Sequence, residues 1–252
     1  MTRRRVWLEA SLSMLAFIAV WEIVSRLIGG RFPVVPAPTA IAAAGVQASY
    51  PIWLNLRLTL IEAALGLIGG SVLGLLLAAA FAAWPRTEAT LYNLVVTIHS
   101  IPLVAVAPIL LIWFGVGITA PAVVAALACF FPMVVSATRG FRAASPSSLD
   151  LMRVLGASTT QSFLRVRLPA SLPFIIAALK IGAPAAVLGA TVGEWLGTAG
   201  IGYLLFSSMA NFQVPLLWAT MLVAAGVAAV GYLIFAGIEG LAVDWRGRGT
   251  AT

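Results

Sequence analysis

Few residues in this chain are of types that do chemistry. Only 9% of its 252 residues are charged, and it holds one histidine and one cysteine. One histidine and widely spaced acids give no metal-ligand cluster, nucleophile–base pair or carboxylate dyad, so we expect no metal site and no catalytic residue in this chain. Cys129 cannot form an intrachain disulfide and is interpreted as a small buried apolar residue.

Acids within apolar segments are the first functional candidates, because a charge at the centre of a membrane helix costs about 2.5 to 3.5 kcal/mol. Glu62 follows Arg57 by five residues, a poor spacing for a pair along one helix, so we expect each to find a partner elsewhere. A structural pairing is favoured over a substrate role. Glu194 ends an apolar segment, and two interpretations stay open: with Thr198 and residues 200–202 it shapes an outer gate or binding-protein contact, or it caps the short helix that follows.

A second group of candidates surrounds a pair of prolines. His99 and Ser100 precede Pro102, where they could offer hydrogen bonds to a solute or sense pH, or His99 could simply be a packing residue. Pro102 and Pro108 remove backbone donors, and a broken helix at membrane depth is tolerated where protein or a water-filled cavity satisfies the freed carbonyls. Both a cavity-lining break and a simple kink remain open. The pathway or gate candidates are His99, Ser100, Pro102, Pro108, Trp113, Glu194 and Tyr203.

These residues must be positioned by membrane helices. Hydrophobic residues make up 62% of the chain, and its charged fraction lies far below the roughly 25% of soluble domains. At about 20 apolar residues per span, the composition supplies six or seven helices. We predict one all-α, polytopic membrane domain over residues 1–252, with about six transmembrane helices. The predicted spans are 6–28, 56–83, 91–114, 118–138, 173–192 and 214–238. Small residues at every fourth position from Gly66 to Ala82 predict a groove for close helix packing.

The distribution of arginine predicts the orientation. With the N-terminus in the cytoplasm, eleven arginines lie inside and three outside, as the positive-inside rule requires. Both termini are then cytoplasmic, and residues 29–55 form an outer loop with a surface helix near 39–48. Lys180 lies near the cytoplasmic end of its span, where it can snorkel to headgroups. The net charge of +7 therefore indicates membrane topology, and we expect no nucleic acid partner.

Residues 139–169 are the main polar segment, with five arginines and no run long enough to cross a bilayer. Ser147 stands three residues before Asp150, and Ser158 three before Gln161; both spacings are typical of a helix N-cap.

Gly156 is placed to end the first of two short helices, and Leu168-Pro169 to end the second. The segment thus predicts a cytoplasmic helix–turn–helix. Its apolar side chains among arginines suit docking into a groove of a soluble partner, or alternatively a hairpin lying on headgroups.

The spacing of this segment resembles the permease subunits of bacterial ABC importers. Their cytoplasmic loop reads E-A-A, three residues, Gly, nine residues, Ile-x-Leu-Pro; here Gly156 and residues 166–169 match, while Asp150-Leu151-Met152 keeps only an acid from the first part. Residues 101–115 and 193–204 resemble the nitrate, sulfonate and taurine branch. The likeness extends from about residue 53 to residue 238.

The resemblance implies a type I ABC importer permease fold in the bacterial inner membrane. It implies a homodimer of this subunit, two separate ATPase subunits that bind ATP and Mg, an extracytoplasmic substrate-binding protein, and surrounding membrane lipid; this chain itself binds no cofactor. The only lysine, Lys180, has no glycine-rich loop beside it, so the chain lacks a P-loop. The ATPase-coupling residues implied by the resemblance are Asp150, Leu151, Arg153, Gly156, Ala157, Ser158, Phe163, Leu168 and Pro169.

The resulting hypothesis is a non-enzymatic subunit that forms the import pathway for a small solute. Resemblance favours an organic or inorganic anion such as a sulfonate, taurine or nitrate. A pyrimidine or flavin vitamin precursor, or an aromatic acid, is the alternative cargo. Other classes that remain open are an ion-coupled secondary transporter or channel, and a membrane-embedded enzyme or scaffold; the chain shows no internal repeat or multiple intramembrane acids that would favour ion coupling.

Overall fold

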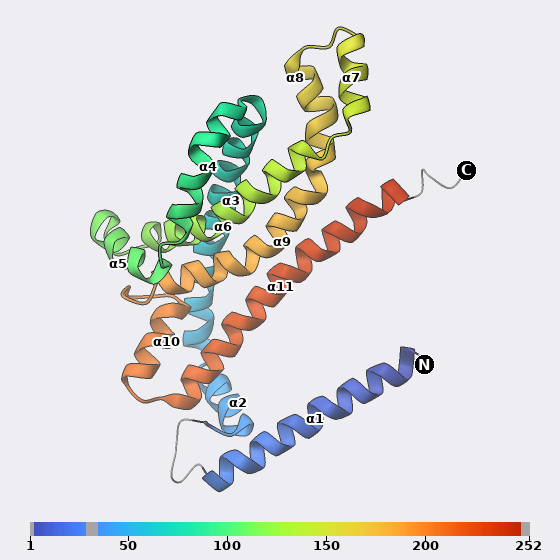
Figure 1. Cartoon of the computed structure of the whole chain (residues 1–252). Coiled ribbons are helices and arrows are strands. Elements are labelled where there is room, and N and C mark those ends of the chain that lie inside the picture. Colours follow the sequence, from blue (N-terminus) through green and yellow to red (C-terminus); the bar gives the residue numbers. More distant parts are fainter. Residues whose placement is uncertain (1–2, 29–34, 248–252) are drawn as a thin grey trace.

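Helices make up all the regular structure in the part of the chain that is described. The computed structural model describes residues 3–28 and 35–247 (Figure 1). The elements are α1 (Arg3–Ile28), α2 (Pro38–Gln47), α3 (Ser49–Ala83), α4 (Pro85–His99), α5 (Leu103–Phe114), α6 (Thr119–Arg142), α7 (Pro146–Val154), α8 (Thr159–Ser162), the π-helical turn η1 (Phe163–Arg167), α9 (Leu168–Gly193), α10 (Ile201–Ala210) and α11 (Val214–Gly247). The predicted all-α fold is confirmed.

Four helices in the described residues are long and apolar enough to cross a bilayer, and a bent pair, α4 with α5, raises the number to five. The four are Ser49–Ala83, Thr119–Arg142, Thr159–Gly193 and Val214–Leu241. α1 overlaps the predicted first span, 6–28, and a sixth crossing formed by it stays a prediction. α2 forms where the surface helix was predicted.

The predicted third span is broken rather than continuous. α4 and α5 meet at an angle of 92°, so they form either a broken span or a re-entrant loop. Pro102 is the N-cap of α5, and it both lacks a backbone donor and disfavours helical geometry at Ile101. Pro108, by contrast, lies inside α5 without ending it. Of the two prolines expected to interrupt this span, only Pro102 does so.

The core is built where α3, α6 and α9 touch backbone to backbone. A Cβ on Gly70 would overlap the carbonyl oxygen of Ala126, and one on Gly74 would lie 2.8 Å from the oxygen of Phe130. α9 approaches α6 in the same way, since a Cβ on Gly189 would lie 2.8 Å from the Cα of Ala125. The groove predicted from small residues at every fourth position is therefore confirmed, and α6 fills it.

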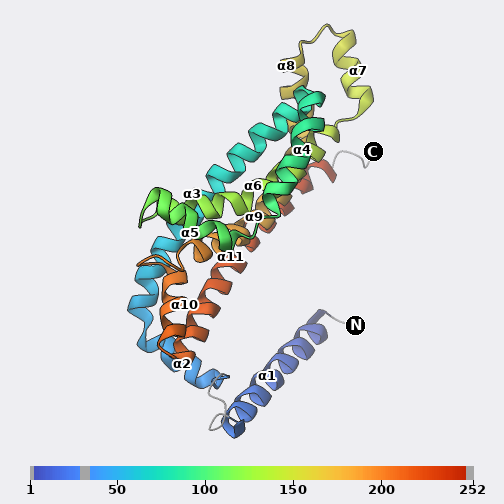
Figure 2. The ribbon, with the colours of Figure 1, turned by 60° about the vertical axis from the view of Figure 1, so that its left-hand side comes forward.

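Apolar side chains cover the outside of the molecule as well as its core. In α11 the most apolar 18-residue window has no buried residue, although Ala219 and Thr220 near its start are buried, and α1 exposes large apolar side chains along its length. Figures 1 and 2 show α1 standing apart from α3, α6 and α9. It contacts α11 through Trp21 and Trp218, whose ring centroids are 5.4 Å apart. Such surfaces suit lipid or a second protein chain.

The polar segment folds as the predicted helix–turn–helix, with two corrections. We call α7, α8 and η1 together the α7–α8 hairpin; it projects beyond the neighbouring helix ends (Figure 1). The N-cap of α7 is Ser145 rather than Ser147, because Pro146 occupies the first helical turn. Pro169 does not end the second helix, because it sits in the first turn of α9, where its missing N–H is harmless. The hairpin therefore continues into a span.

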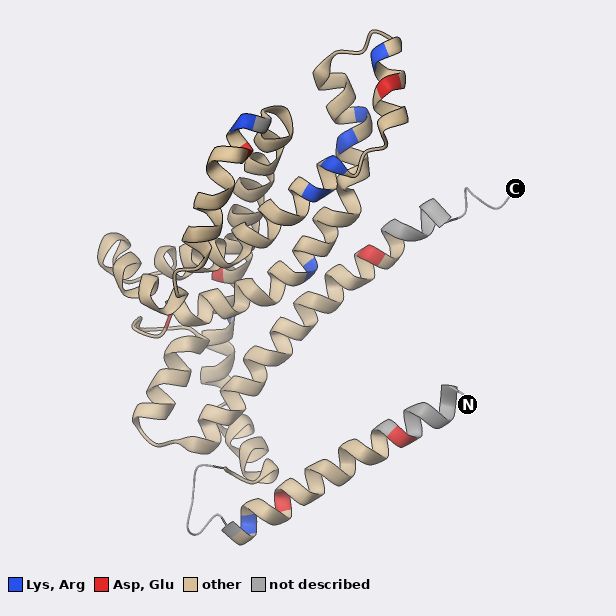
Figure 3. Ribbon diagram, in the orientation of Figure 1, with Lys and Arg blue, Asp and Glu red and all other residues tan. Residues whose placement is uncertain are grey.

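Charge is concentrated near this hairpin. Figure 3 shows most of the basic residues on the hairpin and on the adjoining ends of α4 and α6, with others on α1 and α9. The side chain of Arg142 on α6 pairs with Glu88 on α4, which ties these two helices together at the hairpin end. Lys180 pairs with Glu239 of α11 and lies 5.8 Å from the ring centroid of Tyr232. It is thus bound to a neighbouring helix rather than snorkelling to headgroups.

Candidate functional site

The turn of the α7–α8 hairpin has two well-formed helix caps. Gly156 adopts a φ of +71°, and its N–H donates to Arg153 O while the N–H of Ala157 donates to Met152 O at 2.9 Å. Only glycine takes this conformation without strain, so its predicted place at the end of α7 is confirmed. The hydroxyl oxygen of Ser158 accepts from the N–H of Gln161, whose side chain accepts from the N–H of Ser158. This is the predicted capping box.

The tip of the hairpin is apolar and exposed. Leu151, Val154 and Leu155 are 58%, 84% and 69% exposed. Beside them Arg153 donates to Asp150 at 2.7 Å, an exposed ion pair that contributes little to stability. The surface has an apolar centre bordered by charged side chains, which is the usual composition of a protein-docking patch.

The remaining coupling candidates lie at the base of the hairpin. Phe163 packs on Phe141, with ring centroids 5.0 Å apart, and Leu168 joins the same buried cluster against α6. Pro169 lies in the first turn of α9. The nine candidates therefore separate into an exposed tip and a packed base that holds the tip to α6 and α9.

At the other end of α9, Glu194 caps the N-terminus of α10. Glu194 is 1% exposed; its Oε1 accepts from the hydroxyl of Thr59 and its Oε2 from the N–H of Gly202, both at 2.6 Å. The N–H of Ile201 donates to Thr59 Oγ1 at 2.9 Å, and the N–H of Gly200 to Asn55 Oδ1 at 2.7 Å. We call this arrangement the Glu194 cap. It satisfies three of the free N–H groups at a helix start.

The Glu194 cap explains the glycines of residues 200–202. Gly200 has a φ of +101°, and a Cβ there would overlap the carboxyl group of Glu194. A Cβ on Gly202 would overlap the carbonyl oxygen of Thr191. Any other residue at either position would push α10 away from the acid. The capping interpretation of Glu194 is therefore the one that the geometry supports.

Glu62 lies beside this cap rather than beside a cation. It is 4% exposed, its carboxyl contacts that of Glu194, and its Oε2 has no hydrogen-bond partner. No ion pair with either acid occurs among the described residues, so the structural pairing expected for Glu62 is not found. The two carboxyls form a pair that the sequence analysis, which expected no carboxylate dyad, missed. A separation of 132 positions in the chain leaves no local signal for it.

A pocket of about 190 Å³ adjoins the two acids. We call it the acid pocket; its walls come from α3, the α5–α6 turn and the α9–α10 connection. It is lined by Leu58, Glu62, Leu111, Val116, Gly117, Ile118, Pro121, Gly193, Glu194, Gly197, Thr198 and Ala199. Apart from the two carboxyls, most of these side chains are apolar.

The candidates around the helix break lie on α4 and α5. The imidazole of His99 stacks on the ring of Phe131 at 4.0 Å between centroids, with an interplanar angle of 8°. His99 and Ile101 help to line a pocket of about 160 Å³. The hydroxyl of Ser100 donates to the carbonyl of Val96 and so helps to end α4. The break therefore lines a cavity, and His99 also has the packing contact of the alternative interpretation.

Trp113 and Tyr203 complete the predicted set. Trp113, near the end of α5, is 73% exposed, and Tyr203, in the first turn of α10, is 37% exposed. Neither lines a described pocket with His99. The pathway candidates thus form separate groups along the molecule.

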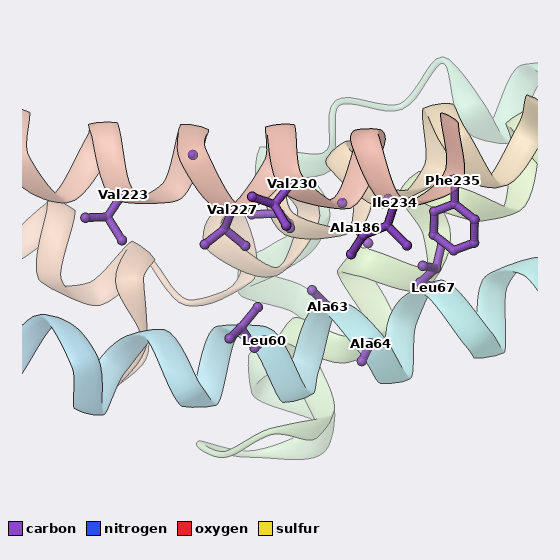
Figure 4. Close-up of a pocket in the computed structure, with 14 residues that line it drawn as sticks. Leu60, Ala63, Ala64, Leu67, Ala186, Val223, Val227, Val230, Ile234 and Phe235 are labelled. Atoms are coloured by element: carbon purple, nitrogen blue, oxygen red, sulfur yellow. The ribbon is translucent and has the colours of Figure 1, made fainter. Parts of the chain in front are cut away.

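A larger pocket, of about 540 Å³, lies between α3, α9 and α11. Figure 4 shows Leu60, Val227 and Ile234 among the side chains that surround it. All its lining residues are apolar, so it offers a polar solute no hydrogen bond. It is suited to an acyl chain or an apolar side chain.

Residues 70–243 match the family described as binding-protein-dependent transport system inner membrane component. The chain belongs to this family. It is 33% identical over 241 residues to the formylaminopyrimidine transport permease of Halalkalibacterium halodurans, covering 95% of this chain and 96% of that one. It is 27% identical over 247 residues to a putative aliphatic sulfonates transport permease of Bacillus subtilis, covering 97% and 90%.

The fold agrees with this assignment. The permease superposes on a chain of the inward-facing MetNI methionine ABC transporter with a TM-score of 0.62, covering 76% of this chain and 94% of that one at 18% identity. The resemblance to ABC importer permeases is confirmed, and the permease is a multi-pass inner-membrane subunit of an ABC importer. Permeases of this family work with a substrate-binding protein, as the family description states.

Proposed function

We propose that this permease subunit forms the import pathway for a small solute and that a separate ATPase drives it by docking on the tip of the α7–α8 hairpin. The observation that carries the proposal is the exposed apolar tip of Leu151, Val154 and Leu155. It projects beyond the bundle, away from the apolar flanks that suit lipid (Figure 1). A patch of this kind needs a protein partner to cover it.

The base of the hairpin explains how docking moves the spans. Phe163 and Leu168 pack into the cluster that joins α6 and α9, and α8 runs through η1 into α9 without a break. A displacement of the tip is therefore passed to two spans as a rigid-body motion. ATP and Mg bind to the partner, whose closure supplies the displacement.

The proposed assembly has two copies of this subunit, two ATPase subunits and an extracytoplasmic substrate-binding protein. The arginine-rich hairpin and both termini face the cytoplasm, because basic loops are retained on that side. The Glu194 cap then lies toward the outer side, at the far end of α9 from the hairpin. In this position it fixes α10 to α3 where solute arrives.

The cargo that the described residues favour is a small nitrogen-bearing polar solute. The acid pocket carries two carboxyl groups and is lined by no lysine or arginine; Arg142 and Lys180 pair with acids elsewhere. The relative named for formylaminopyrimidine is also more similar to this chain than the one named for sulfonates. A small anion, supported by the sulfonate relative, is the second candidate, with recognition then supplied by the binding protein.

Reconstitution tests the docking proposal. The permease is placed in liposomes with the ATPase and binding protein of its own importer, and solute-stimulated ATP hydrolysis and uptake are measured. Val154→Asp puts a charge in the centre of the tip and is expected to lower both rates at least tenfold. Thr160→Asp adds the same charge at an exposed position of the same hairpin, outside the apolar tip, and serves as the matched control.

Two outcomes would contradict the proposal. Unchanged stimulation in the Val154→Asp permease would remove the tip as the docking surface. Uptake that continues without ATP and collapses with the ion gradient would indicate a secondary transporter or channel instead.

A further inference from the structure

The starting observation is a buried acid that lacks a donor. Glu62 is 4% exposed, and its Oε2 accepts no hydrogen bond. The neighbouring carboxyl, Glu194, already accepts from Thr59 and Gly202, so the only donor that it could offer Glu62 is a proton shared between the two acids. A buried carboxyl without a donor costs free energy, so native structures supply one from protein, water or ligand.

No lysine or arginine among the described residues lies close enough to donate a hydrogen bond to Glu62, so the donor is sought outside the described chain. The other charged group of the acid pocket is Glu194, and neither acid forms an ion pair with a described lysine or arginine. Two carboxyls in contact repel each other when ionised and attract a shared cation. The pocket beside them measures about 190 Å³, roughly six times the volume that one water occupies in the liquid.

The apolar side chains that line the pocket favour a protonated amine over a metal ion. Calcium takes six to eight oxygen ligands, which walls such as Leu58, Leu111 and Val116 cannot provide. A protonated amine needs only a few acceptors at one end and suits apolar walls along its carbon skeleton. Its N–H groups also make charge-assisted hydrogen bonds with carboxylates, which are stronger than neutral ones.

We propose that the acid pocket binds the primary ammonium group of a small solute, with Glu62 as its main acceptor and Glu194 as the second charge. In the proposed orientation the pocket lies toward the outer side of the bundle, so the solute is cargo on its way in; that last step rests on the proposed function, whereas the binding itself does not.

The test measures binding by the purified full-length permease in detergent, followed by thermal unfolding through tryptophan fluorescence. Propylammonium chloride is the probe. Tetramethylammonium chloride at the same ionic strength carries the same charge without N–H donors. We expect propylammonium to raise the unfolding temperature in a saturable way, and tetramethylammonium to leave it unchanged.

Three variants locate the effect. Glu62→Gln removes the main acceptor and is expected to weaken the apparent propylammonium affinity about tenfold or more, the usual loss for a hydrogen bond to a charged group. Leu111→Trp fills the pocket without touching either carboxyl and is expected to abolish the response, which keeps the test valid if Glu62→Gln fails to fold. Glu88→Gln removes an acid outside the pocket and is expected to respond as the wild type does.

The proposal is overturned by any of three results. Equal shifts with both salts would show a general salt effect. An undiminished propylammonium response in Glu62→Gln and Leu111→Trp would place binding elsewhere. A wild-type permease whose unfolding temperature follows pH but not propylammonium would show that a proton alone occupies the site. Because the assay needs no ATPase, its failure leaves the docking proposal standing.

Discussion

At the scale of single residues, the Glu194 cap shows how one acid can fix the position of a helix. It accepts a hydrogen bond from Thr59 of α3 and another from the start of α10. Both donors are buried with it, so water cannot replace the acid when it is removed.

Replacing this acid therefore has a predictable cost. Glu194→Leu leaves the Gly202 N–H without an acceptor and the Thr59 hydroxyl with only its longer hydrogen bond, 3.2 Å to Asn55 O, and is expected to destabilise the permease by about 2 to 5 kcal/mol. Glu194→Gln keeps one acceptor oxygen and is expected to cost less. Thermal unfolding in detergent measures both, and a Glu194→Leu protein that unfolds at the wild-type temperature would contradict the cap.

The residue scale is also where sequence reasoning was least complete. Gly156 and Ser158 were predicted correctly because a cap is a local pattern of a few residues. Ser145 was missed because Ser147 offered a similar spacing. The contact of Glu62 with Glu194 joins distant parts of the chain, and no local periodicity can indicate which distant residue a buried acid will meet.

At the scale of elements, neighbouring glycines of α3 provide a matched test of helix packing. Gly70 faces α6, where a Cβ would overlap Ala126, whereas a Cβ on Gly69 would meet no atom within 4 Å.

We expect Gly70→Ala to destabilise the permease by about 1 to 3 kcal/mol, the usual cost of overpacking. Gly69→Ala should be neutral or stabilising by up to about 1 kcal/mol, because alanine has the higher helix propensity. Thermal unfolding of the two proteins decides the matter, and equal effects would mean that α3 and α6 are not packed through this face.

Elements are also the scale at which the sequence was most informative. Four predicted spans overlap helices that are long and apolar enough to cross a bilayer, because a run of about 20 apolar residues is the main signal for such a helix. The repeat of small residues in α3 also correctly marked its packing face. The sequence predicted one interrupted span over 91–114 and not the 92° bend between α4 and α5. Pro102 indicates that the helix is interrupted, but it does not indicate the direction of the helix that follows. The pairing of Lys180 with Glu239 was missed for the same reason as the acid pair.

At the scale of the whole molecule, the orientation follows from where basic residues gather. Most of those in the described residues lie on the α7–α8 hairpin and the helix ends beside it (Figure 3), and moving them across the membrane during insertion is disfavoured. We therefore predict that the hairpin faces the cytoplasm and that α2 faces outward.

Labelling of single cysteines tests this orientation. Cys129 is buried, and Cys129→Ser removes the only native thiol. In that background Ser147→Cys on the hairpin should react with an impermeant maleimide only in inside-out vesicles, and Gln47→Cys on α2 only in right-side-out cells. The reverse pattern would invert the topology and with it the side on which an ATPase could dock.

One continuous helix connects the α7–α8 hairpin to the Glu194 cap. From Thr159 to Gly193 the backbone is helical for 35 residues, a path of about 52 Å at 1.5 Å per residue along a helix that bends on its way (Figure 1). Its first part, α8 and η1, belongs to the hairpin, and its last turn is followed directly by Glu194. Under the proposed docking, a displacement of the hairpin tip would therefore reach the Glu194 cap along one continuous helix, so we predict that the two ends of the permease move together.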